Sequence, residues 1–424
     1  MPISARLTRR TLLRSGAATL ATPALTGTGL SQSNNVIKIG FVTPQTGALA
    51  AFGGANAFLI AQVQQALRDG LMKGRTRYRV DILTKDSQSN STRAAEVTAE
   101  LILRDKVDLI LTGGAPDTVN AVSDRAEVDG VPCIATACPW QPWFFGRSGN
   151  PTKGFDYTWL FCFGLEDILG AFIGLWAPQP TNKVVACLFA NDADGNAWGE
   201  NFPPALKKAG FTVVEPGRYQ PMSNDFTAQI GAFKAAGAEI VTGTMIPPDF
   251  ATFWTQAAQQ GFRPKIATIG KAFLFPAAVS AFSDRAQGLS CEVPWSSDFP
   301  FKSGLTGQNG AALLAAAQSA SGGRDLGFIL GLFHALFEVG IDALKRAPAL
   351  TPDGIVAAIR DTSYESIVGR VDWKSKSGPI ANVSRTPIVA GQWERAAAGT
   401  PLHLAIKSNA GHPDIPVNGT LKLL

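Results

Sequence analysis

Short apolar runs alternate with segments of helical spacing along the chain from residue 36 onward. Each run ends in turn-forming residues, which is typical of a buried strand. In the first half the runs are 36–42, 79–84, 107–111 and 131–135, and the helical segments between them are 58–67, 92–104 and 117–128. This repetition of strand and helix predicts a parallel sheet covered by helices on both faces.

The same pattern begins again near residue 165. Strands are predicted at 183–189, 211–215, 239–243 and 265–269, and helices at 198–209, 226–236 and 250–260. The fold class is therefore α/β, with two doubly wound parallel-sheet lobes. Ligands bind outside the carboxyl ends of the strands in such sheets, so two facing lobes would form a cleft.

The C-terminal third holds too few strands for a third sheet. Its helices are predicted at 307–320, 325–346 and 352–361, and its short strands at 367–372, 385–390 and 402–406. We expect it to complete both lobes, with the chain crossing between them several times in a hinge. The expected boundaries are 35–157 plus about 293–365 for lobe one, and about 158–292 plus about 366–424 for lobe two.

Charge along the chain argues against a nucleic-acid partner. The 424 residues contain 38 Lys and Arg against 33 Asp and Glu, a formal charge of +5. Four arginines and no acidic residue lie in 1–34, which leaves 34 basic against 33 acidic residues, or +1, for the remainder. The basic excess belongs to the N-terminus, and the rest of the chain has no general attraction to nucleic acid.

The N-terminus resembles an export signal. Arg9 and Arg10 precede a weakly apolar stretch at 15–25, an arrangement similar to a twin-arginine signal over residues 1–34. An amphipathic starting helix is the alternative, although Pro23 would break it. We therefore expect a soluble protein exported to the periplasm. The apolar segment 326–341 is interrupted by His334 and Glu338 and predicts a buried helix rather than a membrane span.

Catalytic, metal and cofactor signatures are weak. The five cysteines form no Cys-x-x-Cys pair, and the three histidines show no metal-ligand spacing. His334 lies in an apolar helix, which favours a core histidine. The segment 113–117 follows a strand and opens a helix, so its backbone N–H groups could hold an anion, but it lacks the lysine of a phosphate loop. We predict no catalytic residue, no metal and no cofactor.

An ordered set of landmarks resembles one family. They are Ile39–Gly47 with its Pro-x-Thr-Gly turn, Asp86, Asp108–Gly114, Gly130–Ala135, Asn191–Gly195 followed by Trp198-Gly199, Gly369–Asp372 and Gly391–Trp393. Together they are similar to type I periplasmic solute-binding proteins of the leucine/isoleucine/valine-binding branch, which serve ABC transporters. The resemblance extends from about residue 36 to 409.

The resemblance implies a ligand site in lobe one. In the family, the loops after the third and fourth strands hold a ligand carboxylate. These positions are Gly114, Ala115, Pro116, Asp117 and Thr118, then Ala137, Cys138, Pro139 and Trp140. The two prolines depart from the family, because they cannot donate from a backbone nitrogen. Asp117 would either hold an ammonium or cap its helix. Phe52 matches a pocket wall in the family, or belongs to the core.

Lobe two would supply the closing contacts. The family places an acidic residue after a late strand, and that position here is Lys271. A cation there would disfavour an α-amino group and welcome an anionic or carbonyl group; a solvated lysine beside a shifted register is the alternative. Asp194, Trp198 and Ile246 are further strand-end candidates. The aromatic segment 140–145 would line the cleft edge or pack on the hinge.

These features predict the extracytoplasmic substrate-binding component of an ABC transporter. Its partners would be a small amino-acid-like, amide or aromatic carboxylate solute and a permease in the inner membrane, and the resemblance implies a monomer. One alternative is a ligand sensor or partner-binding module on the same fold. Another is an exported α/β enzyme.

Overall fold

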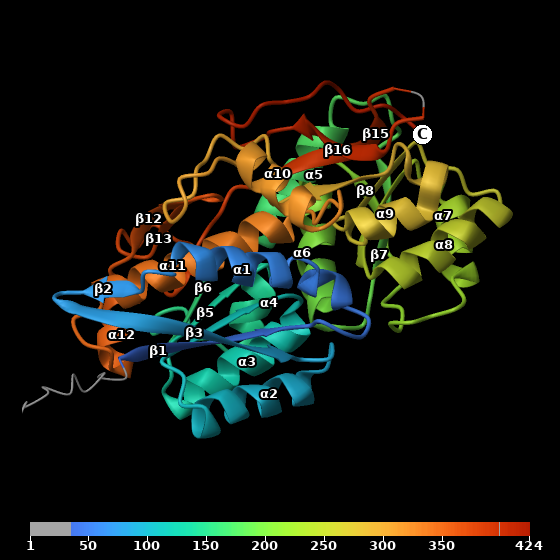
Figure 1. Cartoon of the computed structure of the whole chain (residues 1–424). Helices are drawn as coiled ribbons and strands as arrows, with labels where there is room; N and C mark the ends of the chain where they lie inside the picture. The colour runs from blue at the N-terminus through green and yellow to red at the C-terminus, as the bar shows by residue number, and fades with distance from the viewer. Residues whose placement is uncertain (1–34, 398) are drawn as a thin grey trace, which may run out of the picture. The chain divides into compact units, whose positions relative to one another are not determined.

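The computed structural model describes residues 35–397 and 399–424. The predicted export signal at 1–34 lies outside the described residues. From Val36 to Leu424 the chain forms one compact unit, which contains two seven-stranded sheets and one two-stranded sheet (Figure 1).

The first large sheet has the strand order β14-β6-β5-β4-β1-β3-β2. Its strands are β1 (Val36–Thr43), β2 (Leu71–Lys73), β3 (Thr76–Asp86), β4 (Leu109–Gly113), β5 (Cys133–Thr136), β6 (Thr158–Phe161) and β14 (Val383–Ser384). All neighbours are parallel except the β2–β3 hairpin. The interior strand β1 pairs through Ile39 with Ile82 on one side and Leu109 on the other, so its backbone is hydrogen-bonded along both edges.

Helices cover both faces of this sheet (Figure 1). The helices α1 (Asn56–Ala66) and α11 (Ile329–Arg346) cover one face, and α2 (Ser91–Ala99) and α3 (Pro116–Asp129) cover the other. Consecutive residues of β1 point to opposite faces, as the pleat requires. Phe41 therefore contacts Phe337 of α11 at a ring distance of 4.9 Å, whereas Val42 packs with the α2 and α3 side chains.

The second large sheet has the order β16-β15-β11-β10-β9-β7-β8. Its strands are β7 (Val184–Phe189), β8 (Thr212–Val214), β9 (Ile240–Met245), β10 (Ile266–Lys271), β11 (Ser290–Val293), β15 (Val389–Arg395) and β16 (Leu402–Ser408). The last two strands are antiparallel additions at one edge. The covering helices are α5 (Leu165–Trp176) and α6 (Ala193–Lys208) on one face, and α7 (Thr227–Ala235), α8 (Pro247–Gln259) and α9 (Pro276–Phe282) on the other.

The strand membership confirms two doubly wound lobes joined by several crossings. The described chain passes from one sheet to the other after β6, after β11 and again after β14. Two strands, β6 and β14, belong to the first sheet although their residues fall in the ranges expected for lobe two. Between the second and third crossings lie α10 (Gly310–Ala320), α11, α12 (Pro352–Arg360) and the hairpin of β12 (Ser363–Ser366) and β13 (Gly369–Asp372).

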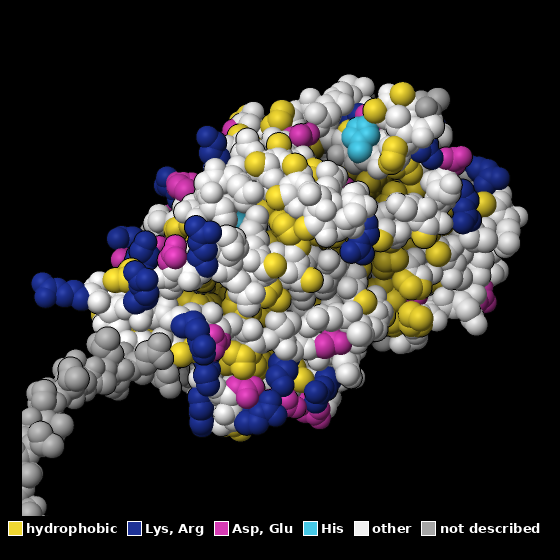
Figure 2. All heavy atoms as spheres, in the orientation of Figure 1, with side chains coloured by type: hydrophobic (Ala, Val, Ile, Leu, Met, Phe, Trp, Pro, Cys, Tyr) yellow, Lys and Arg dark blue, Asp and Glu magenta, His cyan; other side chains and the backbone are white. Residues whose placement is uncertain are grey.

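The surface carries both signs of charge. Figure 2 shows lysine and arginine side chains interspersed with aspartates and glutamates, which agrees with the +1 balance outside residues 1–34. None of the helices in the described part of the chain combines the length and the apolarity needed to cross a bilayer.

Candidate ligand-binding site between the two sheets

A small cavity of about 30 Å³ lies where the carboxyl ends of both sheets meet. From the first sheet it is lined by residues that follow β1, β4, β5 and β6, and from the second sheet by residues at or after the ends of β7, β9, β10 and β11. This is the place where open parallel sheets bind ligands. Eight of the fourteen predicted site residues line it: Phe52, Ala115, Pro116, Ala137, Pro139, Asp194, Trp198 and Lys271.

Lys271 is the cation of the site, and it is buried rather than solvated. Only 5% of the residue is exposed. Its Nζ lies 2.8 Å from Oδ2 of Asp194 and 3.8 Å from Oδ2 of Asp192. Asp192 is also the N-cap of α6, because its side chain accepts a hydrogen bond from the backbone N–H of Gly195. The helix therefore presents two carboxylates to one ammonium group.

The charges around Lys271 shift its pKa and those of its neighbours. Burial alone would lower the pKa of Lys271, but the carboxylates of Asp194 and Asp192 outweigh burial and raise it. Burial raises the pKa of Glu292 to about 7, although the backbone N–H of Lys271 donates to its Oε1 at 3.2 Å. Burial also raises the pKa of Asp117. The site thus holds one cation among four acidic groups.

Three buried polar atoms around the cavity find no hydrogen-bond partner among the described residues. They are Oδ1 of Asp194, Nε1 of Trp198 and Oε2 of Glu292, and all three residues line the cavity. Buried polar atoms in folded proteins are nearly always paired with protein or with a bound molecule. Their convergence on one cavity indicates a place built to hydrogen-bond a guest.

Aromatic rings form the apolar wall of the cavity. Phe52 and Phe328 are far apart in the sequence, but their ring centroids lie 6.2 Å apart. Phe52 also contacts Phe275, from the loop before α9, with centroids 4.9 Å apart. Trp198 stacks on Phe202 at 4.3 Å with an interplanar angle of 23°. Phe52 thus belongs to the core and also lines the cavity, so the two interpretations of its role are compatible.

The loop after β4 lines the cavity through Ala115 and Pro116 and not through a hydroxyl group. The hydroxyl of Thr118 donates to the carbonyl of Ala115 at 3.2 Å, and Gly114 does not line the cavity. Asp117 lies in the first turn of α3, where Ala115 is the N-cap, and it makes no side-chain cap. Instead its Oδ1 accepts from the backbone N–H of Ala193 at 3.5 Å, which links the two lobes.

The loop after β5 divides between the cavity and the core. Ala137 and Pro139 line the cavity, whereas Cys138 is buried beside it with its thiol facing the carbonyl of Pro139 at 3.5 Å. Trp140 opens α4 (Trp140–Phe144), and its indole N–H donates to Oε1 of Glu166 at 3.0 Å. Trp140 is therefore held by α5 and does not line the cavity.

The aromatic segment 140–145 packs against α3 on one side and against the crossing after β6 on the other. The indole N–H of Trp143 donates to Oγ of Ser123 on α3 at 3.1 Å. The guanidinium of Arg147 lies over the rings of Trp143 and Phe155, at 4.8 and 4.0 Å from their centroids. The cluster fixes α4 against α3. The start of α4 also bonds to the crossing that follows β6, because the backbone N–H of Trp140 donates to the carbonyl of Phe163 at 3.2 Å and Oε1 of Gln141 accepts from the N–H of Leu165 at 2.8 Å. The segment therefore packs on the hinge and does not line the cavity.

Two kinds of cavity residue escape the sequence pattern. Glu292 lies inside a short apolar strand, and a single acidic residue in such a run is the signal that could have identified it, because buried carboxylates are rare. Phe328 is the N-cap of α11, and Phe163 lies just after β6. Neither residue carries a comparable signal in the sequence. Ile246, a predicted site residue, is the N-cap of α8 and does not line the cavity, whereas the nearby Thr244 does.

Two residues beside the cavity adopt a left-handed backbone although they are not glycine. Ala137 has φ of 63° and Lys271 has φ of 65°. Such conformations cost of order 1 kcal/mol or more and cluster at functional sites. Each follows or ends a strand of a different sheet, so both lobes turn sharply where they face the cavity.

The site leaves no room for a side chain at Gly270. A Cβ atom there would lie 2.6 Å from the ring of Trp198 and 3.1 Å from Oε1 of Glu292. We expect Gly270→Ala to lower the free energy of unfolding by about 1–3 kcal/mol, because the stacked Trp198 cannot move freely. Gly231→Ala is the control, since a Cβ on this α7 glycine meets nothing within 4 Å. Equal urea-unfolding midpoints for the two variants would contradict the expected clash.

A serine, a histidine and a glutamate also meet, but away from this site. Oγ of Ser303 lies 2.9 Å from Nε2 of His334, and Oε1 of Glu338 lies 3.8 Å from the same nitrogen. A nucleophile relay needs the carboxylate on the other ring nitrogen, and Nδ1 has no partner among the described residues. Burial lowers the pKa of His334 to about 4. The histidine lies in the core, as its helix predicts.

The described residues do not form a metal site. No group of three or more His, Cys, Asp and Glu side chains within 35–397 and 399–424 has the arrangement of a metal centre. All five cysteines are buried and free.

The fold resembles several solved structures. The leucine-binding protein LivK of Thermotoga maritima is 20% identical, with a TM-score of 0.71 over 89% of this chain and 99% of that one. A solute-binding protein of an ABC transporter from Rhodopseudomonas palustris, solved with 3,4-dihydroxybenzoic acid, is 20% identical, with a TM-score of 0.69 over 89% and 99%. LivJ of Streptococcus pneumoniae, solved with isoleucine, is 17% identical, with a TM-score of 0.68 over 92% and 99%.

Comparison at the level of sequence identifies the family. A search of curated proteins gave no match. A family model described as "periplasmic binding protein" matches residues 36–395, which is most of the chain. Two sheets of mainly parallel strands, three crossings and a cavity at the facing strand ends are the features of its type I fold. The chain belongs to the periplasmic binding protein family.

Proposed function

We propose that this protein is the extracytoplasmic substrate-binding component of an ABC transporter. The observation that carries the proposal is the convergence of three unpartnered buried polar atoms, from Asp194, Trp198 and Glu292, on a cavity formed by both lobes. A structural core would pair these atoms or replace them with apolar groups, because an unsatisfied buried group costs about 1–3 kcal/mol.

The polar groups define the chemistry of the solute. The indole N–H of Trp198 can donate only, Oδ1 of Asp194 lies beside the paired Oδ2 and can accept, and Glu292 with a pKa of about 7 can do either. Lys271 already occupies the position beside Asp194 and Asp192 that a ligand ammonium would take. The site therefore favours a small aromatic solute whose polar groups are a hydroxyl, carbonyl or amide, with its ring against Phe52 and Phe328.

The size of the cavity requires the lobes to move. About 30 Å³ holds one or two water molecules, whereas binding sites for small organic ligands are usually ten times larger or more. The three crossings between the sheets are the natural hinge. Separation of the lobes admits the solute, and closure around it buries the polar groups of both.

The proposed partners follow from the same role. The closed, solute-bound form would dock on a permease in the inner membrane, and the protein would act as a periplasmic monomer without enzymatic activity. The second structure in the comparison, solved with 3,4-dihydroxybenzoic acid, supports an aromatic acid as one solute class. The leucine-binding protein in the comparison supports amino acids as a second solute class.

The test is a calorimetric titration of the protein with 4-hydroxybenzoate, benzamide and leucine. We expect 4-hydroxybenzoate or benzamide to bind, and Trp198→Phe to weaken that binding about 5- to 30-fold, because one hydrogen bond to the ligand is lost while the ring remains. Trp254→Phe, on the outer helix α8, is the control and should leave the affinity unchanged.

Two results would contradict the proposal. Absence of binding for all three compounds at millimolar concentration would remove the transport role in favour of a sensor that responds to another protein. Tighter binding of leucine than of either aromatic compound would retain a solute receptor but would overturn the inference drawn from Lys271.

A further inference from the structure

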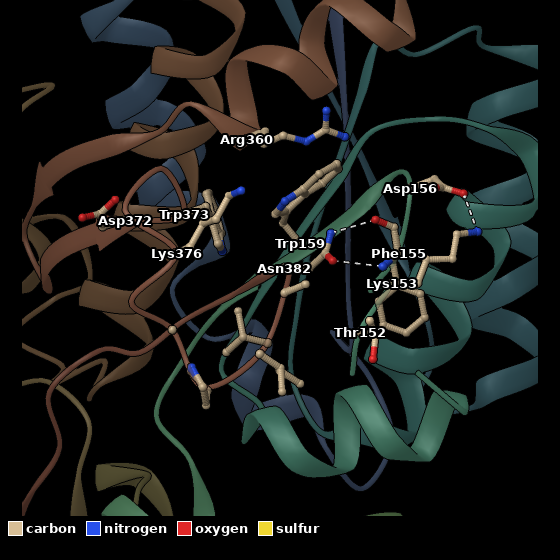
Figure 3. A pocket seen from close by; sticks show the side chains of 15 residues that line it. Thr152, Lys153, Phe155, Asp156, Trp159, Arg360, Asp372, Trp373, Lys376 and Asn382 are labelled. Atoms are coloured by element: carbon tan, nitrogen blue, oxygen red, sulfur yellow. Dashed lines mark hydrogen bonds and ion pairs between the residues drawn. The ribbon is translucent and has the colours of Figure 1, made fainter. Parts of the chain in front are cut away.

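We propose a second ligand site, for a planar aromatic anion, on the outer edge of lobe one. A cavity of about 530 Å³ opens there, within the usual range for small-molecule sites. It shares no lining residue with the interlobe cavity. It lies where the segment 373–382 passes β6 before the chain enters the edge strand β14 (Figure 3).

Two tryptophans supply flat walls for this cavity. Trp159 in β6 is 3% exposed and Trp373, which follows β13, is 6% exposed, yet both line it. The indole N–H of Trp373 is engaged, because it donates to the carbonyl of Leu160 at 3.1 Å. The ring of Trp373 is therefore fixed in place. The small parts of the two rings that face the cavity offer apolar contact to a flat guest.

Two cations at the cavity have no counter-ion. Arg360, at the end of α12, and Lys376, in the covering segment, form no ion pair or side-chain hydrogen bond with any described residue, and both are exposed. In Figure 3 their side chains and Trp159 surround one space. A third cation, Lys153, is paired with Asp156 at 3.2 Å. Unpaired cations beside aromatic rings match a ligand that combines a ring with a carboxylate.

Two further polar groups of the lining, Asn382 and Asp372, are hydrogen-bonded to the backbone around the cavity. Nδ2 of Asn382 donates to the carbonyls of Phe155 and Thr158 at 2.9 Å, and its Oδ1 accepts from the N–H of Phe155 at 2.9 Å. Oδ1 of Asp372 accepts from the N–H of Ser375 at 2.9 Å. The lining holds three cations, Lys153, Arg360 and Lys376, against the two carboxylates of Asp156 and Asp372. Its net charge of +1 suits an anion of single charge.

The experiment uses 2-naphthoate as the probe and the full chain as the protein. Titration followed by tryptophan fluorescence should show binding of 2-naphthoate, and weaker binding of the neutral 2-naphthamide. The double variant Arg360→Gln, Lys376→Gln should lose at least tenfold in affinity for 2-naphthoate. Both residues are exposed, so an unchanged melting temperature will show that the fold is retained.

Two controls separate this site from the interlobe cavity. Lys374→Gln removes a neighbouring cation that is paired with Asp361 at 3.1 Å and does not line the cavity, so it should leave the affinity unchanged. Trp198→Phe alters only the interlobe site and should also leave it unchanged. Absence of binding, equal affinity in the double variant, or a loss caused by Trp198→Phe would each overturn the proposal. The first two results leave the transport role untouched, whereas the third would place the probe in the interlobe cavity and support that role.

Discussion

Replacing Lys271 by methionine is expected to lower the free energy of unfolding by about 3–5 kcal/mol at pH 8, because one partner of a buried ion pair is removed while the others remain. Methionine keeps most of the side-chain volume, so the loss reports charge rather than packing. Asp194 and Asp192 would face each other without the ammonium that now lies 2.8 and 3.8 Å from them. Urea unfolding at pH 8 measures the effect.

The pH dependence of the free energy of unfolding shows whether the loss in the Lys271→Met variant comes from the missing charge. In the wild type, the raised pKa of Lys271 gives stability that is present below the unfolded pKa near 10.5 and is lost only as the pH rises through the higher folded value. In the variant, unpaired buried carboxylates gain a raised pKa, so lowering the pH toward 5 should restore part of the stability. Adding Asp194→Asn should restore part of it at pH 8. A variant as stable as the wild type at pH 8 would contradict the pairing.

Replacing Glu338 by glutamine is expected to change the pH profile of stability by about 3 kcal/mol between pH 5 and pH 8. Burial raises the pKa of Glu338 from 4.5 to about 7. The folded protein therefore holds more protons than the unfolded chain in this window, and wild-type stability falls as the pH rises. Glutamine cannot ionise, so the variant should gain stability relative to the wild type as the pH rises from 5 to 8.

Glu338 is tolerated in the core because it accepts hydrogen bonds from two backbone N–H groups. Its Oε2 accepts from the N–H of Ile367 at 3.0 Å and its Oε1 from the N–H of Leu305 at 3.3 Å, so it fastens two loops to α11. Glu292, with a pKa of about 7, contributes a slope of the same sign, and His334 contributes the opposite slope as the pH falls from 6.5 toward 4. The control is the exposed Glu365→Gln. Parallel pH profiles for the Glu338→Gln variant and the wild type would exclude the buried titration.

The alternation of apolar runs and helical segments was sufficient to predict both sheets, because buried parallel strands leave a strong signal. The pattern located β7, β9 and β10 within two residues. It missed β6, which has only four residues, two of them aromatic, and so is too short to show a clear apolar run. It also missed the pairing of β14 with β6, since two residues carry no periodicity and their position depends on the crossing that follows.

The candidate site was predictable where it depends on strand ends and unpredictable where it depends on side-chain direction. The family resemblance placed Lys271 and Ala115 beside the cavity, and the end of a predicted strand placed Asp194 there. The sequence could not show that Lys271 points back to the start of α6 rather than toward solvent or ligand, because that orientation is set by the N-cap and first turn of another element. For the same reason Trp140 was expected at the cavity, whereas its indole is bonded to Glu166.

The contact between Asp117 and Ala193 has a consequence for measured affinities. It joins the two lobes while the cavity is almost filled by protein atoms, so the closed arrangement has its own stabilising contacts without a guest. Under the proposed role, only the fraction of molecules with separated lobes can accept a solute, and the apparent dissociation constant equals the intrinsic one divided by that fraction. Selectivity among solutes would then reside in the cavity, while the concentration at which the receptor responds would be set by the strength of this self-closure.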